Sequence, residues 1–351
     1  MTKNRIRKII VTVIFLPLFL AMSSSLVRAD EGRQLHRISG MDRYETAYSV
    51  AIRNWTTSEN VVLVSGEGYA DTVNASVLAK KLDAPIILTT QDILSSNTQM
   101  ALNILRTKNI YIIGGNASVS QGIRDKLKAK YNLIELGGDT RYETNLKVAN
   151  ELIKLGTSAE DILVVGGEGF SDALSIAPIA AIKGKILLLV NNNSVSIQPI
   201  IDFVKNNNSK VTVVGTKNVI SDDIFKVLGG TTRIDGGANR FDTNLKILDT
   251  FKSELNFNKI YISSATPSEP DNMYADALVA AALAGKYSSP LVLVDKEPSS
   301  DLRDSNATDN AINYIENNAI PTSELLLIGG ESVISQTTED EIYKYIIPRA
   351  Y

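Results

Sequence analysis

The chain has 351 residues, of which 44% are hydrophobic and 21% charged, a balance typical of folded globular proteins rather than disordered or fibrous chains. It contains no cysteine, which excludes disulfides, thiol nucleophiles and cysteine-based zinc sites. Its one histidine, His36, would have to serve any catalytic triad or imidazole-bound metal alone. We therefore expect no metal and no cofactor.

Residues 1–29 have the layout of a secretory signal peptide. Four basic residues precede an apolar run at 9–21, and Val27 and Ala29 occupy the −3 and −1 positions of a cleavage site. The run is shorter than the ~18–20 apolar residues that span a bilayer, although an uncleaved membrane anchor is the alternative. No later apolar stretch reaches that length, so we expect no membrane span in the mature chain.

Cleavage after residue 29 would make the mature chain distinctly acidic. The removed segment holds five basic and no acidic residues, which lowers the formal net charge from −3 to −8. A general nucleic-acid binder carries the opposite sign, so nucleic acid is not expected as a partner. An anionic ligand would have to be bound by local cations.

Four sequence landmarks recur three times in the same order. The first reads GMDRYET at 40–46, GDTRYET at 138–144 and GANRFDT at 237–243. The second reads VVLVSGEGYADTVNA at 61–75, LVVGGEGFSDALSI at 163–176 and, after an insertion, YADAL at 274–278. The third is an apolar strand, PIIL at 85–88, KILL at 185–188 and PLVL at 290–293. The fourth reads IYIIGGNASVS at 110–120, VTVVGTKNVIS at 211–221 and LLLIGGESVIS at 325–335.

The repeats divide the mature chain into three similar units. The motif arginines lie 98 and 99 residues apart, a period that suits a small α/β domain and is too long for a solenoid repeat. The spacing predicts units at 30–132, 133–231 and 232–351, with no residues left over for a separate catalytic domain.

Within each unit, short β-branched runs alternate with helical patterns. Residues 61–64, 86–88 and 110–113 are hydrophobic on both faces, as buried parallel strands are, whereas 70–82 and 97–108 have helical periodicity. This order predicts right-handed crossovers and a parallel, Rossmann-like sheet with helices on both faces. The predicted fold class is therefore α/β, in three tandem units.

The GEG segment at 66–68 suggests a dinucleotide site, because a strand, Gly-x-Gly and a helix follow one another. The position that packs the helix against the strand holds Asp71, however, and Asp172 and Asp276 repeat this choice. A carboxylate there caps the helix and repels a pyrophosphate. We expect the three aspartates to cap helices, with a direct polar contact to a ligand as the alternative.

Arg43, Arg141 and Arg240 occupy the most regular motif, with glycine three residues before and threonine three residues after each. The following residues begin a helix, which places each arginine at a strand-to-helix turn, where ligand sites of open α/β sheets lie. Two roles are open. The arginines contact a ligand, or they pair with an acidic residue of the same or a neighbouring repeat and fix how the units pack.

The apolar strand of the third landmark is most simply explained as core, because consecutive apolar residues in a buried parallel strand need no functional role. Its residues are Ile86, Ile87, Leu88, Ile186, Leu187, Leu188, Leu291, Val292 and Leu293.

Taken together, the four landmarks closely resemble the cell wall binding repeat 2 family over nearly all of residues 33–351. The resemblance implies three Rossmann-like units packed as an intramolecular pseudo-trimer, in a secreted protein of a Gram-positive cell wall. It also implies non-covalent anchoring to an anionic, teichoic-acid-like wall polysaccharide, with surface-layer proteins as further partners. The third repeat departs most, since residues 263–266 replace the GEG segment and Val292 interrupts the apolar strand.

These features favour a monomeric, non-catalytic binding protein. Three similar sites on one chain bind a repeating polymer by multivalency, and guanidinium groups suit a phosphate-bearing glycan. The candidate polymer contacts are Arg43, Arg141, Arg240, Asp71, Asp172 and Asp276. The rival hypothesis is an amidase-type peptidoglycan hydrolase that uses the repeats as its catalytic body, which the missing cysteine and single histidine disfavour.

Overall fold

The computed structural model describes residues 32–68, 74–169, 171–266, 274–298 and 307–347, all within the unit Gly32–Tyr351. The strands form three parallel, four-stranded sheets, in the orders β3-β2-β4-β5, β7-β6-β8-β9 and β1-β12-β10-β11. The first sheet comprises β2 (Asn60–Ser65), β3 (Ile86–Thr89), β4 (Asn109–Ile113) and β5 (Asn132–Leu136). The second comprises β6 (Asp161–Gly166), β7 (Leu187–Val190), β8 (Lys210–Val214) and β9 (Gly230–Ile234). The third comprises β10 (Lys259–Ser264), β11 (Leu291–Val294), β12 (Glu324–Ile328) and β1 (Gln34–Ile38).

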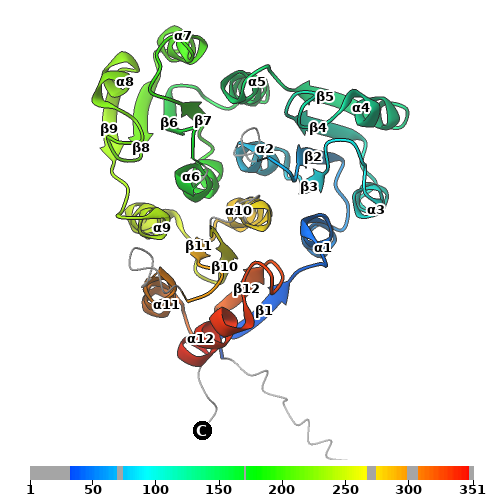
Figure 1. The fold of residues 1–351 in the computed structure, drawn as a ribbon, viewed down its shortest axis with the longest axis vertical. Helices are drawn as coiled ribbons and strands as arrows, with labels where there is room; N and C mark the ends of the chain where they lie inside the picture. The colour runs from blue at the N-terminus through cyan, green and yellow to red at the C-terminus, as the bar shows by residue number, and fades with distance from the viewer. Residues whose placement is uncertain (1–31, 69–73, 170, 267–273, 299–306, 348–351) are drawn as a thin grey trace, which may run out of the picture. The chain divides into compact units, whose positions relative to one another are not determined.

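Helices connect the strands and cover the sheets (Figure 1). Those of the first repeat are α1 (Arg43–Asn54), α2 (Ala75–Leu82), α3 (Ser96–Ile104) and α4 (Gln121–Lys128). The second repeat has α5 (Arg141–Lys154), α6 (Ser171–Ile182), α7 (Gln198–Asn206) and α8 (Asp222–Val227). The third has α9 (Arg240–Thr250), the 3₁₀ turn η1 (Lys252–Glu254), α10 (Ala275–Tyr287), α11 (Ala307–Asn318) and α12 (Gln336–Ile346).

The fourth strand of every sheet comes from the start of the next repeat. β5 and β9 lead into α5 and α9 but pair with β4 and β8. β1, near the start of the described chain, pairs with β12 near its end, from Gln34 opposite Glu324 to Ile38 opposite Ile328 (Figure 1). The predicted unit boundaries at 132/133 and 231/232 thus fall within these shared strands, and β1 closes the three repeats into a ring.

Three helices, α2, α6 and α10, pack against one another between the sheets (Figure 1). They meet at equivalent positions, because a Cβ added to Gly285 would lie 2.9 Å from Cβ of Ala181 and 4.0 Å from Cβ of Lys80. Every residue of α6 from 173 to 181 is buried, as expected for a helix that is apolar all round. The predicted α/β class and pseudo-trimeric packing are confirmed.

Strand register corrects one detail of the repeat alignment. Ile86 lies opposite Val62, and Leu187 lies opposite Leu163. Leu187 is therefore the counterpart of Ile86. The segment that aligns with 85–88 is 186–189, one residue later than the segment KILL at 185–188. The helix predicted over 97–108 also ends early, at Ile104, because the chain takes a left-handed turn two residues later with φ of 56°.

Candidate functional site

Each copy of the arginine motif builds the start of a helix. In the first copy, the N-cap Asp42 accepts a hydrogen bond from Glu45 N at 2.8 Å, and the Glu45 carboxylate accepts one from Met41 N at 2.8 Å. Thr46 Oγ1 accepts a bond from Gly40 N at 3.1 Å. The first bond satisfies an N–H group that the first helical turn leaves unpaired, and the other two pair N–H groups of the two residues before the N-cap.

The other two copies are built in the same way. Thr140 caps α5 and Asn239 caps α9, each accepting a bond from the third helical N–H at 3.2 Å and 2.8 Å. Thr144 and Thr243 accept bonds from the motif glycines at 3.0 Å and 2.8 Å. Most letters of the motif are therefore explained by the local structure of a helix start.

The aromatic residue of the motif packs on the first glycine of the GEG segment. A Cβ added to Gly66 would lie 2.8 Å from Cε1 of Tyr44, and one added to Gly167 would lie 2.9 Å from Cε1 of Tyr142. In these two repeats the tyrosine ring occupies the space of a side chain, whereas the third repeat has Ala265 at this position and Phe241 in place of the tyrosine.

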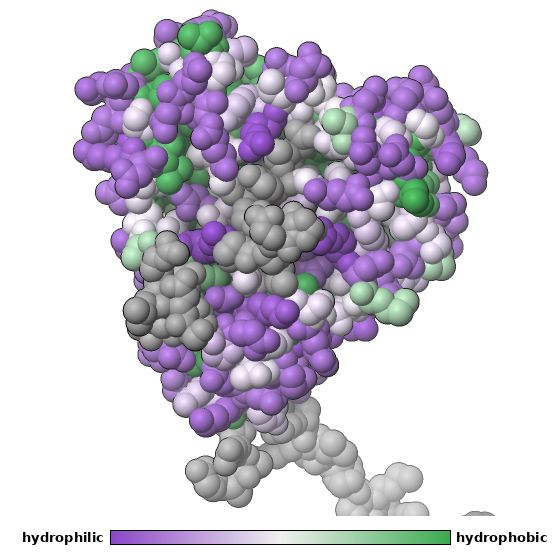
Figure 2. Space-filling view, in the orientation of Figure 1, coloured by the Kyte–Doolittle hydropathy of each residue, from purple (hydrophilic) through white to green (hydrophobic). Residues whose placement is uncertain are grey.

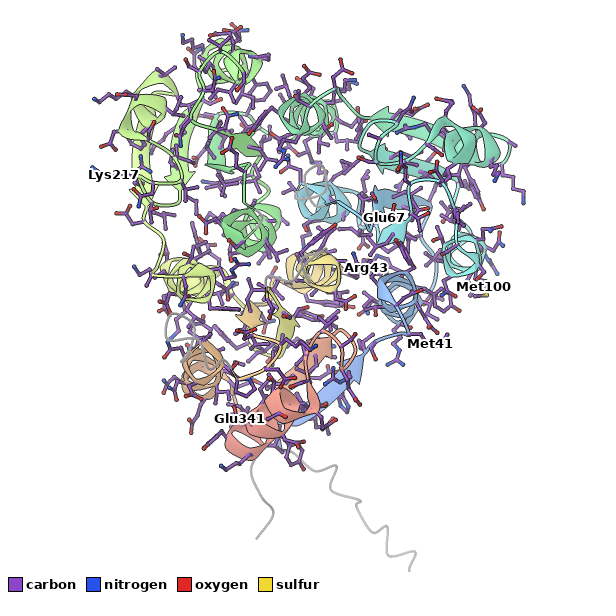
Figure 3. All side chains as sticks on the ribbon, viewed as in Figure 1. Met41, Arg43, Glu67, Met100, Lys217 and Glu341 are labelled. Atoms are coloured by element: carbon purple, nitrogen blue, oxygen red, sulfur yellow. The ribbon has the colours of Figure 1, made fainter. Side chains whose placement is uncertain are left out.

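The motif arginines reach back to the carboxyl end of an inner strand of their own repeat. In each case Nη1 donates to a main-chain carbonyl, and the arginine remains partly exposed. The pairs are Arg43–Gly66 at 2.5 Å, Arg141–Gly167 at 2.5 Å and Arg240–Ala265 at 2.9 Å. In Figure 3, Arg43 lies between α1 and α10, whereas Met41 lies at the outer end of α1.

Two of the repeated aspartates, Asp172 and Asp276, interact with motif arginines of the neighbouring repeat. Burial raises the pKa of Asp276, which is 4% exposed, to about 6, while the Arg43 charge and the Thr46 side chain lower it. Burial also raises the pKa of Asp172, and the Arg240 charge lowers it. Of the two roles left open for the arginines, electrostatic attraction between repeats is thus present for Arg43 and Arg240.

The predicted capping role of the aspartates needs correction. Asp71 lies outside the described residues. Asp172 and Asp276 are the second helical residues of α6 and α10, beyond the N-cap position. There they interact favourably with the helix dipole, and each lies under a glycine: a Cβ on Gly329 would be 2.9 Å from Oδ2 of Asp276.

Pockets open where one repeat meets the next. At the 3/1 junction, a pocket of about 260 Å³ is bounded by residues 40–43, by Asp276 and by the turn residues Gly330, Ser332 and Val333. This pocket brings together the arginine motif of the first repeat and the second and fourth landmarks of the third.

The 1/2 junction has two adjoining pockets, of about 440 and 620 Å³, which share residues 115–116 and 138–139. Arg124 and Lys147 line the smaller pocket, and Arg141 lines the larger. Cations, an amide and hydroxyl groups thus border the depression together with the carboxylates of Glu135, Asp139 and Glu143.

A further pocket, of about 280 Å³, lies at the carboxyl ends of β6, β7 and β8 in the second repeat. Glu168 and Asp172 line it together with Asn191, Asn192 and Asn218. β6 and β8 lie side by side, and from them the chain continues outward to β7 on one side and to β9 on the other. Ligands of open α/β sheets bind at such a switch in strand order. The coloured part of the face drawn in Figure 2 is largely hydrophilic.

The apolar strand residues of the third landmark are each at most 1% exposed. A polymer cannot reach them in the folded protein. Two asparagines missed in the sequence support these strands. Asn145 donates to Leu187 O at 3.0 Å and accepts from Leu189 N at 2.9 Å, and Asn244 does the same on β11. Their position four residues after the motif arginine was the available signal, which Ala47 obscures in the first repeat.

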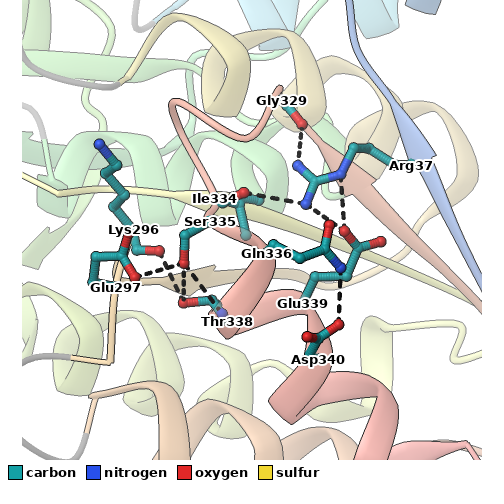
Figure 4. Close-up of polar contacts among 10 residues, drawn as sticks. All are labelled: Arg37, Lys296, Glu297, Gly329, Ile334, Ser335, Gln336, Thr338, Glu339 and Asp340. Carbon is teal, nitrogen blue, oxygen red and sulfur yellow. Dashed lines mark hydrogen bonds and ion pairs between the residues drawn. The ribbon is translucent and has the colours of Figure 1, made fainter.

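A second set of arginines was also missed. Arg37 Nη1 donates to Gly329 O at 2.7 Å, and its Nη2 donates to Ile334 O at 3.1 Å and to Glu339 at 2.6 Å (Figure 4). We call this arrangement, one guanidinium on the two carbonyls that begin and end a glycine turn, the carbonyl clamp. No regular spacing revealed it, because its arginine comes from a strand in two repeats and from a helix in the other.

Among the described residues, no group of histidine, cysteine, aspartate or glutamate side chains is placed to hold a metal ion. In the same part of the chain, no helix is long and apolar enough to cross a membrane.

Three shared-strand α/β repeats with polar junctions define a module built by repetition of one unit. The model of the family described as cell wall binding domain 2 matches residues 37–124, 135–225 and 233–339, and the chain belongs to this family.

Two solved structures from Clostridium difficile resemble the chain. Cwp6 superposes with a TM-score of 0.76 at 25% identity, over 90% of this chain and 49% of that one. Cwp8 gives a TM-score of 0.74 at 26% identity, over 89% and 52%.

Two curated relatives come from Bacillus subtilis (strain 168). The N-acetylmuramoyl-L-alanine amidase LytC is 29% identical over 82% of this chain and 55% of its own length. The amidase enhancer is 30% identical over 77% of this chain and 36% of its own length. The chain therefore spans about half or less of the relatives that it matches.

Proposed function

We propose that the chain is a secreted cell-wall protein that binds an anionic wall polysaccharide through the junctions between its repeats, after loss of a signal peptide at 1–29. The observation that carries this proposal is the threefold recurrence of one polar junction, built from a partly exposed arginine, a helix start and a glycine turn. The family and the wall proteins among its structural neighbours support the same assignment.

The chemistry of the junctions suits a phosphate-bearing glycan. Arg43, Arg141 and Arg240 carry guanidinium groups at the edge of each junction, and Lys147 adds an exposed cation at the 1/2 junction. Guanidinium binds phosphate oxygens through charge-assisted hydrogen bonds. Neutral amides and hydroxyls beside them, such as Asn116, suit sugar hydroxyl groups.

Three similar junctions on one chain would also let a module with weak individual sites hold a long polymer. Once one junction is occupied, the next repeat of the same polymer is present at a high effective concentration. This mode of binding needs no catalytic group, and we propose that the protein has no enzymatic activity. We further propose that neighbouring surface-layer proteins are partners.

The proposal is tested by sedimenting the full chain with purified cell walls, and with walls stripped of phosphodiester-linked polysaccharide. We expect retention by intact walls and loss of retention on stripped ones. Equal retention on bare peptidoglycan would contradict the proposal. Zymography of the same preparation should show no clearing, and clearing by homogeneous protein would favour a hydrolase.

A further inference from the structure

The glycine turn of the fourth landmark has one design in all three repeats. It begins at Gly114, Gly215 or Gly329, whose φ values of 114°, 121° and 128° are accessible to glycine and costly for other residues. Five residues later, the N–H of Val119, Ile220 or Ile334 bonds back to the residue after the glycine, at 3.0, 3.0 and 2.9 Å. The turn therefore has a fixed backbone and a tip that differs between repeats.

The carbonyl clamp holds this turn in each repeat. Arg124 donates to Gly114 O at 2.7 Å and to Val119 O at 3.0 Å. Arg233 donates to Gly215 O at 3.1 Å and to Ile220 O at 2.9 Å. With Arg37 on the third turn, one guanidinium joins the first and last carbonyl of every copy.

The ion pair behind the clamp is reversed between repeats. In the first, the arginine is on helix α4 and its partner Glu135 is on strand β5, at 2.6 Å. Around the third turn, the arginine is on strand β1 and its partner Glu339 is on helix α12, also at 2.6 Å. Strand register makes Glu135 and Arg37 equivalent, since Ile112 and Leu327 lie opposite them. The same clamp is thus made by two opposite arrangements of charge. It therefore does not depend on having an arginine at one particular position of the repeat.

The clamped turns form walls of the junction pockets. Gly330, Ser332 and Val333 line the 3/1 pocket, and residues 115–118 line the pockets of the 1/2 junction. The clamp arginines themselves are shielded, with side chains 16%, 4% and 11% exposed for Arg37, Arg124 and Arg233. Their guanidinium groups donate to carbonyls of the turn, and although Arg124 also borders the smaller pocket of the 1/2 junction, the contact common to all three is with the turn backbone.

We propose that Arg37, Arg124 and Arg233 are positioning residues for polymer binding, which hold the glycine turn of each junction in the conformation that the polysaccharide contacts. This inference rests on the proposed function. It also gives the first strand, β1, a role in binding at the 3/1 junction, because Arg37 on β1 holds the turn at 329–334.

The reversed pairs supply the experiment. Arg37→Glu and Glu339→Arg each place like charges together, whereas the double variant reproduces the arrangement of the first repeat. A third variant, Arg37→Lys, keeps a cation beside Glu339. The lysine ammonium cannot donate to Gly329 O and Ile334 O at the same time. Affinity of each full-length variant for purified wall polysaccharide is measured on folded protein, well below its melting temperature, and the melting temperature is recorded separately.

We expect Arg37→Glu and Arg37→Lys to weaken binding by about tenfold, as loss of hydrogen bonds from a charged donor implies. The double variant should recover most of the affinity. The control is reversal of Lys259 and Glu324, an ion pair at 2.7 Å at the opposite, amino end of the same sheet, which should leave affinity unchanged.

A purely structural role predicts lower melting temperatures with unchanged affinity of the folded protein, and that result overturns the inference. Recovery of stability without recovery of affinity in the double variant overturns it as well. Failure of the wild-type protein to bind polysaccharide would instead overturn the proposed function, so the two outcomes are distinguishable.

Discussion

Asp276, at the start of α10, faces Arg43, at the start of α1, across the junction that joins the third repeat to the first. Burial raises the pKa of Asp276 to about 6, and the positive charge of Arg43 offsets only part of this effect. The junction between the third and first repeats therefore contains a carboxylate that is costly to ionise.

This site makes stability depend on pH in a defined direction. The native state holds the proton of Asp276 up to a pH near 6, whereas an unfolded aspartate loses it near 3.8. Since the unfolded state binds fewer protons in this window, the contribution of Asp276 to stability falls as the pH rises from 4 to 6. Relative to wild type, Asp276→Asn should gain up to about 3 kcal/mol over that range.

Denaturant unfolding of both proteins between pH 4 and pH 7 measures this gain, because the two proteins differ only at residue 276. A constant difference between the two proteins at all pH values would contradict the raised pKa.

The motif arginines allow a second prediction, on how binding is distributed over the repeats. Arg43→Ala, Arg141→Ala and Arg240→Ala should each reduce wall retention modestly, and the triple variant should reduce it far more, because avidity multiplies the sites. A charge-assisted contact with phosphate contributes about 1.5–3 kcal/mol, and retention should also decrease with salt.

Melting temperatures of the same variants separate binding from packing. If stability falls while the folded fraction is retained as well as wild type, the arginines serve only the pairing between repeats. Each variant also loses a bond to a main-chain carbonyl, so some loss of stability is expected in either case.

Periodicity and repetition predicted the fold well because the buried strands and the central helices carry strong local patterns. β3, β7 and β11 are buried throughout, and α6 and α10 consist mostly of alanine and larger apolar residues. The pairing of β5, β9 and β1 with the sheet of another repeat was not predicted, because the local sequence pattern of a strand does not identify its neighbour in the sheet.

The site was predicted less completely. The arginine motif marked the junctions. Most of its repeated residues are explained by capping bonds at the start of a helix, such as the one from Glu45 N to Asp42. The carbonyl clamp was invisible, because Arg37 and Glu339 are distant in sequence and Arg124 and Glu135 exchange their places. Contacts of this kind are fixed by tertiary structure.

A third prediction concerns the glycine under the motif aromatic ring. Gly167→Ala should destabilise the protein by about 1–3 kcal/mol, because the added Cβ would lie 2.9 Å from the ring of Tyr142 in a packed region. Gly169→Ala is the matched control, since nothing lies within 4 Å of its Cβ. Equal stability of the two variants in chemical denaturation would show that the ring moves aside at no cost.

The last prediction is that the three repeats unfold together. Each sheet contains a strand from the next repeat, and β1 completes the third sheet, so unfolding one repeat would expose the edge of another. The only tryptophan, Trp55, reports on the closing contact. Its Nε1 donates to Asp83 O at 2.9 Å, and Lys286 of the third repeat lies 4.6 Å above its ring.

Trp55 fluorescence and far-ultraviolet circular dichroism should therefore give coincident denaturation curves, as two-state unfolding requires. Independent repeats would instead show the fluorescence change in one part of a broader transition, and that outcome would refute the closed ring as a cooperative unit. Deleting β1 (residues 34–38) should lower the midpoint, because β12 would lose its neighbour and the clamp on Gly329 would be lost with Arg37.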